Sequence, residues 1–419
     1  MTVNLSQPLC GCQRWRFFVL RREINMCNEH KNKILPSFIE ERLDFYIADL
    51  IASNDNKKHL VLGKRPSNDA VVMQSNDYLS LSNHKEIRQA HGKAILGHND
   101  NVVMSAIFLQ DSESKPAFEV QLADYVGMES CLISQSGWAA NIGLLQTICT
   151  ENSPVYVDFF AHMSLWEGIR YAGAKAHPFM HNNIKHLRRQ IKRHGEGVIV
   201  VDSVYSTIGT IAPLRDIYEI AREFNCTLIV DESHSIGTHG PKGAGLVKAL
   251  ELNDQVDFIT LSLAKTFAYR AGAILGPTKL AKTLPFVAYP AIFSSTVLPQ
   301  ELVRLEKTLE VIKGADARRV KLFKNAEAIA SGLRNIGFRI QSESQIIALE
   351  CGSERNTERV RDFLEQRDVF GAVFCRPATG KNNNIIRFSI NADLTASDIE
   401  RVLSACQEAF NHPELEFAS

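Results

Sequence analysis

The chain has 419 residues, 45% of them hydrophobic, and its 47 basic residues balance its 47 acidic residues. This zero net charge argues against binding to nucleic acid or to an anionic membrane surface. No apolar run approaches the roughly 18–20 residues of a transmembrane helix. The nine cysteines are scattered and odd in number, so we expect reduced thiols in a cytoplasmic protein, without a disulfide framework or a metal site.

The length suits one large domain and a smaller one. We predict that residues 1–25 are an extension, either poorly ordered or preceding the true start, because Met26 could also serve as an initiator. An amphipathic pattern over 36–52 predicts a helix. The expected parts are an N-terminal helix and linker over 26–73, a large cofactor-binding domain over 74–305 and a small α+β domain over 306–419.

Three apolar runs in the middle of the chain have the length and β-branched content of buried strands, at 198–201, 227–230 and 256–261. A helical pattern over 213–224 separates the first two, which is the order of a βαβ unit. Right-handed crossovers place the carboxyl ends of such strands on the same side of a sheet. We therefore predict one crevice at these strand ends.

The last part of the chain has a different order of predicted helices and strands. A long charged helix is predicted over 306–333, followed by shorter strands at 346–350 and 385–390. A final helix is predicted over 396–410.

Reactive side chains follow two of the central strands. The run at 227–230 leads into Asp231 and His234, and the run at 256–261 leads into Lys265. Ligands of open α/β sheets bind outside the carboxyl ends of the strands. An acid, an imidazole and an amine in one crevice suit pyridoxal phosphate, whose aldehyde a lysine can hold and whose ring nitrogen an acid can pair with.

Several short motifs, taken in order over about residues 35–412, resemble the α-oxoamine synthases, a family of fold type I pyridoxal-phosphate enzymes. The resemblance implies an α/β fold of the aspartate-aminotransferase type and a pyridoxal-phosphate-dependent acyltransferase. Within the family, the stretches at 135–138 and 160–167 and Ala264 resemble the quorum-sensing branch, which makes α-aminoketone precursors of autoinducers. The motifs lie at 75–79, 135–141, 160–164, 181–183, 231–234, 262–265 and 374–377.

The resemblance also implies roles for single residues. Lys265 would bind the cofactor and then act as a general base, Asp231 would face the ring nitrogen, and His162 would stack on the ring. His234 and Ser206 would approach the phenolic oxygen. These four ionisable residues, Lys265, Asp231, His162 and His234, are the expected catalytic residues. Two groups would bind the phosphate. One is the N-terminus of a helix that begins at Ser136, Gly137 and Trp138, and the other is the hydroxyl of Ser262.

A homodimer with active sites at the interface is implied as well. A hydroxyl of Ser294, Ser295 or Thr296 would reach the phosphate in the other subunit. Arg376 would bind the carboxylate of the amino substrate, because a guanidinium donates two parallel hydrogen bonds to a carboxylate. Arg387, on the strand that follows, is interpreted as structural.

The chain departs from the usual family pattern where a glycine-rich stretch is replaced by the apolar residues 104–109. Such a wall would suit a long acyl chain, so we expect a medium-chain acyl-coenzyme A to react with S-adenosylmethionine or 2-aminobutyrate. The alternatives within the family are an 8-amino-7-oxononanoate synthase and a 2-amino-3-ketobutyrate coenzyme A ligase. A noncatalytic subunit that keeps the fold is the alternative from another class.

Overall fold

The computed structural model describes residues 34–51, 59–97, 104–109 and 114–418, so the extension expected over 1–25 lies outside the described residues. The chain divides into two units, Met1–Asp49 and Leu50–Ser419. The described part of the first unit is dominated by helix α1 (Ser37–Tyr46), which begins after Pro36. A π-helical turn, η1 (Ile47–Ile51), continues it, and the helix predicted over 36–52 is confirmed.

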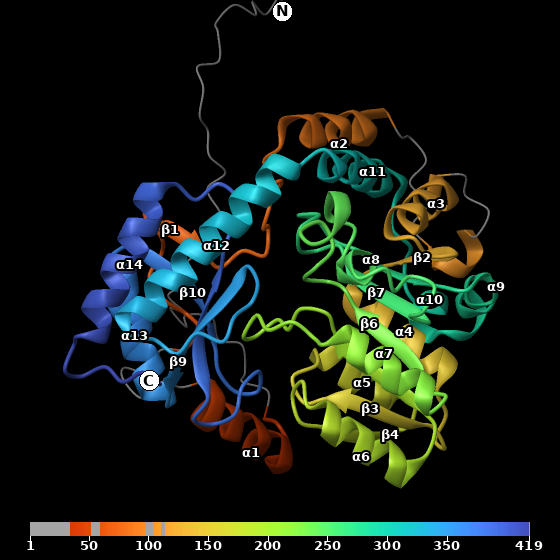
Figure 1. Cartoon of the computed structure of the whole chain (residues 1–419), viewed down its shortest axis with the longest axis horizontal. Helices are drawn as coiled ribbons and strands as arrows, with labels where there is room; N and C mark the ends of the chain where they lie inside the picture. Colours follow the sequence, from red (N-terminus) through yellow and green to blue (C-terminus); the bar gives the residue numbers. More distant parts are fainter. Residues whose placement is uncertain (1–33, 52–58, 98–103, 110–113, 419) are drawn as a thin grey trace, which may run out of the picture. The chain divides into compact units, whose positions relative to one another are not determined.

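The second unit contains two sheets, and the larger has seven strands (Figure 1). Five neighbouring strands, from β7 to β4, are parallel, while β8 runs antiparallel to both of its neighbours. The three strands predicted from the sequence are adjacent and parallel, as expected. In order across the sheet the strands are β2 (Ser130–Ser134), β8 (Gly272–Gly276), β7 (Phe258–Ser262), β6 (Thr227–Asp231), β5 (Val198–Asp202), β3 (Pro154–Asp158) and β4 (Lys175–Phe179).

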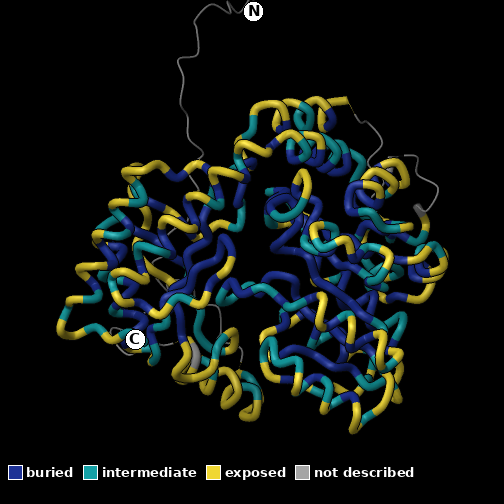
Figure 2. Tube along the Cα trace, viewed as in Figure 1, coloured by how far each residue is buried: buried dark blue, intermediate teal, exposed yellow. Residues whose placement is uncertain are grey.

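Helices bury both faces of this sheet. Alternate residues of a strand point to opposite sides, so each inner strand contributes apolar side chains to two clusters. In β5, Val198 and Val200 belong to one apolar cluster, with α4 (Gly137–Ile148), α5 (Met163–Tyr171) and α9 (Thr278–Val287). Ile199 and Val201 belong to the other, with α3 (Ser114–Val126), α6 (Ile184–His194) and α7 (Leu214–Glu223). Figure 2 shows the inner strands of this sheet as buried, whereas the edge strand β4 is largely exposed. Shorter elements are η2 (Ala106–Leu109), η3 (Pro241–Gly243), α8 (Leu246–Ala249) and α10 (Tyr289–Ile292).

A second sheet has four strands, in the order β1 (Val71–Met73), β10 (Val369–Phe374), β11 (Asn384–Ser389) and β9 (Ile346–Gly352). The predicted strands at 346–350 and 385–390 are confirmed as β9 and β11. Strand β1 pairs in parallel with β10, so a segment from before the large sheet joins the sheet formed by the last part of the chain. The helices that accompany this sheet are α12 (Asp316–Ile336), α13 (Glu354–Gln366) and α14 (Ala396–Phe410). The last of these is the helix predicted over 396–410.

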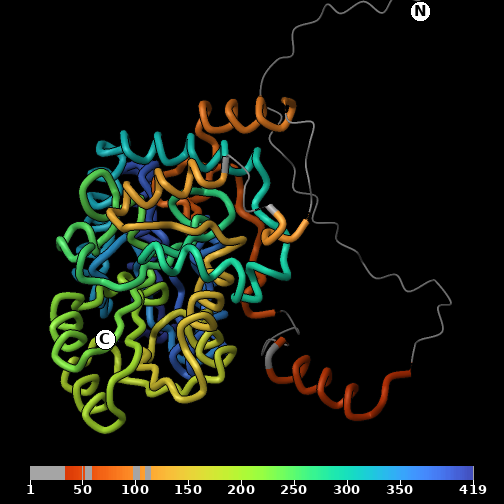
Figure 3. Tube along the Cα trace, turned by 90° about the vertical axis from the view of Figure 1, so that its right-hand side faces the viewer, coloured from red at the N-terminus to blue at the C-terminus, as the bar shows by residue number. Residues whose placement is uncertain are grey.

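The single helix predicted over 306–333 is wrong. The chain forms α11 (Pro299–Lys313), breaks at Gly314 and starts α12 at Asp316. Glycine is a poor helix former, and Asp316, at the start of the new helix, pairs with Arg319. Helix α11 packs on α2 (Lys85–Gly97), and Figures 1 and 3 show the two side by side.

The division at 73/74 and 305/306 stays a prediction. Helix α12 contacts α14, whereas α11 contacts α2 and α3. Across the described ranges, no helix is both long and apolar enough to cross a membrane.

Candidate active site

The carboxyl ends of the parallel strands bring the predicted acid and amine together. Asp231 ends β6 and is in register with Asp202 of β5 and Thr260 of β7. Lys265 follows the end of β7 by three residues. Burial lowers the pKa of the Lys265 ammonium, and nearby Arg387 lowers it further, while Asp231 opposes the shift. A lowered pKa increases the fraction of neutral amine, which is the form that can react or accept a proton.

Asp231 is 5% exposed and is held by two hydrogen bonds. The backbone N–H of Ser233 donates to Oδ1 over 2.9 Å, and Asn141 Nδ2 donates to Oδ2 over 2.8 Å. The neighbouring Asp202 is fully buried, and burial and the Asp231 carboxylate raise its pKa well above the ordinary range. The protonated form of Asp202 is thereby favoured.

His162 stands at the N-terminus of α5, where its backbone N–H donates to Asp202. Its Nδ1 lies 2.7 Å from Ser164 Oγ, and its ring is nearly perpendicular to that of Trp138, at a centroid distance of 6.1 Å. Burial is the largest cause of its lowered pKa. A neutral, fixed imidazole suits the predicted stacking role.

His234 is buried, and its Nδ1 lies 2.7 Å from the hydroxyl of Tyr78. Burial lowers the pKa of His234 well below its usual value, and Lys265 and Arg387 add to the shift. The ring is therefore neutral at neutral pH. Its backbone carbonyl accepts a hydrogen bond from Gln345, so both ends of the residue are held.

Arg387 lies in the same crevice, although the sequence predicts only a structural role for it. Its side chain is buried, and it donates to the Ser206 carbonyl over 2.7 Å and to Asn76 Oδ1 over 2.8 Å. Its Nε is buried without a hydrogen-bond partner among the described residues. Its guanidinium lies 4.6 Å from the ring of Phe374 and lowers the pKa of Lys265. Ser206, which is predicted to approach the phenolic oxygen of the cofactor, therefore contacts Arg387 through its backbone carbonyl.

Arg376 occupies a different environment. Its Nε pairs with Glu354 Oε1 over 3.0 Å, and the two side chains are 26% and 31% exposed. A partly exposed ion pair already uses part of this guanidinium. The role of Arg376 in substrate binding stays a prediction, and Arg387 joins it as a second candidate.

The predicted phosphate residues converge at the start of α4. Ser136 is the N-cap, and its hydroxyl accepts from the Ala139 N–H over 3.1 Å. The N–H groups of the first helical turn have no acceptor within the helix, so they favour an anion. A Cβ on Gly137 would lie 2.6 Å from Ser262 Cβ, so only glycine allows this close approach. Ser136, Gly137, Trp138 and Ser262 therefore form one group, which we name the cradle.

The segment with Ser294, Ser295 and Thr296 lies beside the cradle through Gln135. Gln135 Nε2 donates to the Ser295 carbonyl over 2.8 Å, and Ser294 Oγ donates to the Pro290 carbonyl. Ser295 forms an antiparallel bridge with Ser105. That one of these three hydroxyls reaches the phosphate in the other subunit stays a prediction.

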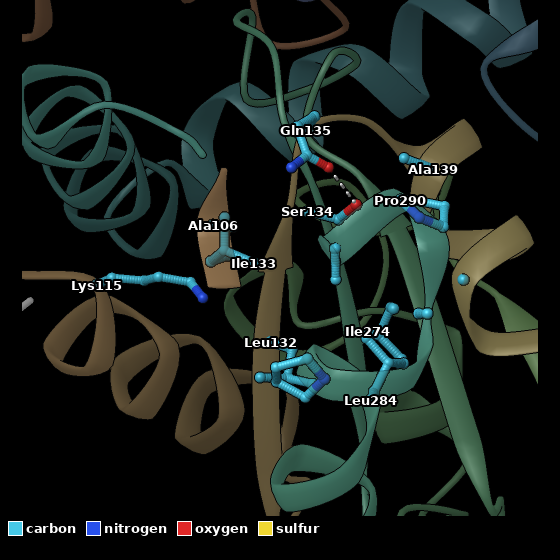
Figure 4. A pocket seen from close by; sticks show the side chains of 14 residues that line it. Ala106, Lys115, Leu132, Ile133, Ser134, Gln135, Ala139, Ile274, Leu284 and Pro290 are labelled. Carbon is cyan, nitrogen blue, oxygen red and sulfur yellow. Dashed lines mark hydrogen bonds between the residues drawn. The ribbon is translucent and has the colours of Figure 1, made fainter. Parts of the chain in front are cut away.

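A narrow pocket lies next to the cradle. Figure 4 shows the side chains around it, with Lys115 of α3 extending toward Ile133. Lys115 pairs with Glu119 over 3.4 Å, and both side chains are nearly buried. Ala106, from the apolar stretch at 104–109, lines this pocket, whereas the Phe108 side chain is 72% exposed. A wall for an acyl chain at 104–109 stays a prediction.

These residues fit pyridoxal phosphate. A cradle too close for a Cβ suits a phosphate, a buried carboxylate faces the same crevice as a buried lysine, and a neutral imidazole flanks them. The described residues include no group of three or more histidine, cysteine, aspartate or glutamate side chains that could hold a metal ion.

Comparison with known proteins gives the family. The family model for aminotransferases of class I and II matches residues 68–405. The chain belongs to this family. It is also 78% identical to the CAI-1 autoinducer synthase of Vibrio campbellii over 94% of this chain and 100% of that protein. The 8-amino-7-oxononanoate synthase of Coprothermobacter proteolyticus is 28% identical, over 81% of this chain and 87% of that protein.

The solved structures agree on the fold. A serine palmitoyltransferase with pyridoxal phosphate superimposes with a TM-score of 0.77 at 23% identity, covering 88% of this chain and 94% of that chain. An 8-amino-7-oxononanoate synthase from Francisella tularensis gives a TM-score of 0.73 at 20% identity, covering 82% and 98%. The fold type I architecture, the pyridoxal phosphate cofactor and the enzyme class, an α-oxoamine-type acyltransferase, are confirmed.

Proposed function

We propose that the protein condenses a medium-chain acyl-coenzyme A with a small amino acid-like donor, S-adenosylmethionine or 2-aminobutyrate, to give an α-aminoketone precursor of an autoinducer. The observation that carries this proposal is the 78% identity to the CAI-1 autoinducer synthase over nearly the whole of both chains. Two relatives whose names include 8-amino-7-oxononanoate synthase are only 28% and 27% identical to this chain. The housekeeping alternatives are therefore less well supported.

Arg387 is the residue that we expect to bind the carboxylate of the amino donor. It keeps a buried, unpaired Nε, and each of its two terminal nitrogens uses one proton on Ser206 or Asn76. A buried cation without a carboxylate partner is costly, so an incoming carboxylate would stabilise it. Arg376, tied to Glu354 in a partly exposed pair, would act at the edge of the site.

Lys265 would hold the aldehyde of the cofactor and later move the α-proton of the donor. Its lowered pKa supports both tasks, because the neutral amine is the reactive form. When bound, the cofactor supplies an electron sink for the charge that develops at the α-carbon. Asp231 would face the ring nitrogen, and its fixed carboxylate would keep a proton there.

The two histidines would orient the cofactor without changing charge. The pKa values of His162 and His234 are both lowered by burial. His162 would lie on the ring, and His234, fixed by Tyr78, would donate toward the phenolic oxygen from its other nitrogen.

The active unit in this proposal is a homodimer in the cytoplasm. Large apolar side chains of α9, α10 and the residue that follows are exposed, with Phe286 at 59%, Tyr289 at 52% and Phe293 at 74%. They lie in the same part of the chain as Ser294, Ser295 and Thr296, so a second subunit would cover both. The described cysteines, Cys131, Cys149, Cys226, Cys351, Cys375 and Cys406, are all free thiols, which supports a reducing compartment.

A substrate panel tests the proposal. Purified protein is given acyl-coenzyme A of increasing chain length together with S-adenosylmethionine, 2-aminobutyrate, alanine or glycine, and thiol release is followed. We expect the highest kcat/KM with a medium chain and one of the first two donors. Preference for pimeloyl-coenzyme A with alanine, or for acetyl-coenzyme A with glycine, would instead establish one of the housekeeping activities.

A further inference from the structure

A buried asparagine joins two of the residues predicted to contact the cofactor. Asn141 lies on α4, one turn after Ser136 and Gly137, and its side chain is buried. Its Nδ2 donates one hydrogen bond to Asp231 Oδ2 over 2.8 Å and another to Ser164 Oγ over 2.8 Å. Both protons of the amide are therefore used within the site.

The orientation of this amide follows from the charge of its neighbour. An amide oxygen carries only lone pairs and would repel a carboxylate oxygen at 2.8 Å. The amino group of Asn141 must therefore face Asp231. Its Oδ1 is buried and has no hydrogen-bond partner in the described part of the chain, which costs stability. That cost indicates that the amide is retained for its two donated bonds.

Ser164 links Asn141 to His162 by hydrogen bonds. Because Ser164 Oγ accepts from Asn141, its own proton can be donated to His162 Nδ1, 2.7 Å away. The backbone N–H of Ser164 donates to the same nitrogen over 3.3 Å. His162 Nδ1 is thus an acceptor, which places the proton of the neutral imidazole on Nε2.

Close packing of α4 and α5 makes this bridge possible. A Cβ on Gly168 of α5 would lie 2.6 Å from Leu145 Cδ1 and 3.0 Å from the Asn141 carbonyl oxygen. A larger residue would crowd the Leu145 side chain and the Asn141 carbonyl, so glycine at 168 allows the close approach across which Asn141 reaches Ser164.

We propose that Asn141 is a positioning residue that orients the Asp231 carboxylate and, through Ser164, fixes the tautomer and ring orientation of His162. One amide would thus set both the group that faces the cofactor's ring nitrogen and the group that lies on its ring face. The inference rests on the cofactor site of the proposed function, and it assigns Asn141 no contact with substrate.

The test compares three variants of the holoenzyme. Asn141→Ala removes both bonds that the amide donates. Ser164→Ala removes the hydroxyl that links Asn141 to His162 but keeps the backbone N–H of residue 164, and Thr147→Val is the control. Thr147 lies on the same helix and donates only along it, to the Gly143 carbonyl. The readouts are the visible absorption of the bound cofactor against pH, the ¹⁵N signals of selectively labelled histidine, and kcat and KM.

For Asn141→Ala we expect kcat to fall about 10- to 100-fold, with both KM values within about threefold of the wild type. Its cofactor absorption should shift its pH midpoint by about one unit, because the Asp231 carboxylate loses a donor. Ser164→Ala should leave that midpoint in place while the His162 ¹⁵N signals shift, because Nδ1 then keeps only the longer bond from the backbone N–H of residue 164. Thr147→Val should match the wild type in every readout.

An Asn141→Ala enzyme with wild-type kcat and an unchanged absorption midpoint would overturn the inference. Should that variant fail to fold, unchanged His162 signals in Ser164→Ala would overturn it equally. If the wild type releases thiol with none of the expected substrates, the proposed function fails, yet the absorption and ¹⁵N changes still decide the role of Asn141.

Discussion

The two arginine candidates can be separated by replacing each with lysine, which keeps the charge but loses the planar fork. In Arg387→Lys, the bonds to the Ser206 carbonyl (2.7 Å) and to Asn76 Oδ1 (2.8 Å) cannot both be kept, and the unpaired Nε is lost. A hydrogen bond to a charged group contributes about 1.5–3 kcal/mol, which is roughly 10- to 100-fold in an equilibrium constant. We expect the KM for the amino donor to rise by that factor.

Arg376→Lys is the matched comparison. Arg376 is partly exposed and pairs with Glu354, and exposed pairs contribute about 1 kcal/mol or less. We expect its KM for the amino donor to rise less than about fivefold. The assay is thiol release with each substrate varied in turn, and the KM for acyl-coenzyme A should stay within about threefold in both variants. A larger donor KM for Arg376→Lys than for Arg387→Lys would refute the assignment of Arg387.

Three further changes test other parts of the site. Ala271 has a φ of 94°, so its replacement by glycine should raise the free energy of unfolding by up to about 1 kcal/mol in a denaturant titration. An unchanged or lower denaturation midpoint would count against backbone strain at this residue. Gly137→Ala should weaken cofactor binding about tenfold when the apoprotein is titrated, whereas equal affinity would remove Gly137 from the cradle. Burial raises the pKa of Glu232 from 4.5 to about 7, so the folded state loses stability as pH rises through this interval. Glu232→Gln should abolish that loss, about 3 kcal/mol between pH 5 and 8, and an unaltered pH dependence of unfolding would contradict it.

The strand ends could be predicted from the sequence because short apolar runs ending in polar residues are a local signal. Asp231 follows such a run directly, His234 and Lys265 come within four residues of theirs, and the parallel register places Asp231 beside Asp202. The sequence does not predict the break at Gly314, because one glycine in a charged helical pattern is often tolerated.

The supporting residues could not be predicted with the same ease. Asn76, Tyr78 and Asn141 stand inside the motifs at 75–79 and 135–141, but nothing local shows that their partners lie far along the chain. Arg387 was assigned a structural role because it lies on a strand. Its burial near Lys265 depends on how the four-stranded sheet meets the strand ends of the seven-stranded sheet, which sequence periodicity does not encode.

Reduction of the holoenzyme with borohydride, followed by peptide mass mapping, tests the central claim most directly. We expect the yellow colour to be lost and the reduced cofactor to be found on the peptide that carries Lys265. The Lys265→Ala protein should carry no label and should not form product at a measurable rate. Label on another lysine, or product at the wild-type rate from Lys265→Ala, would contradict the account.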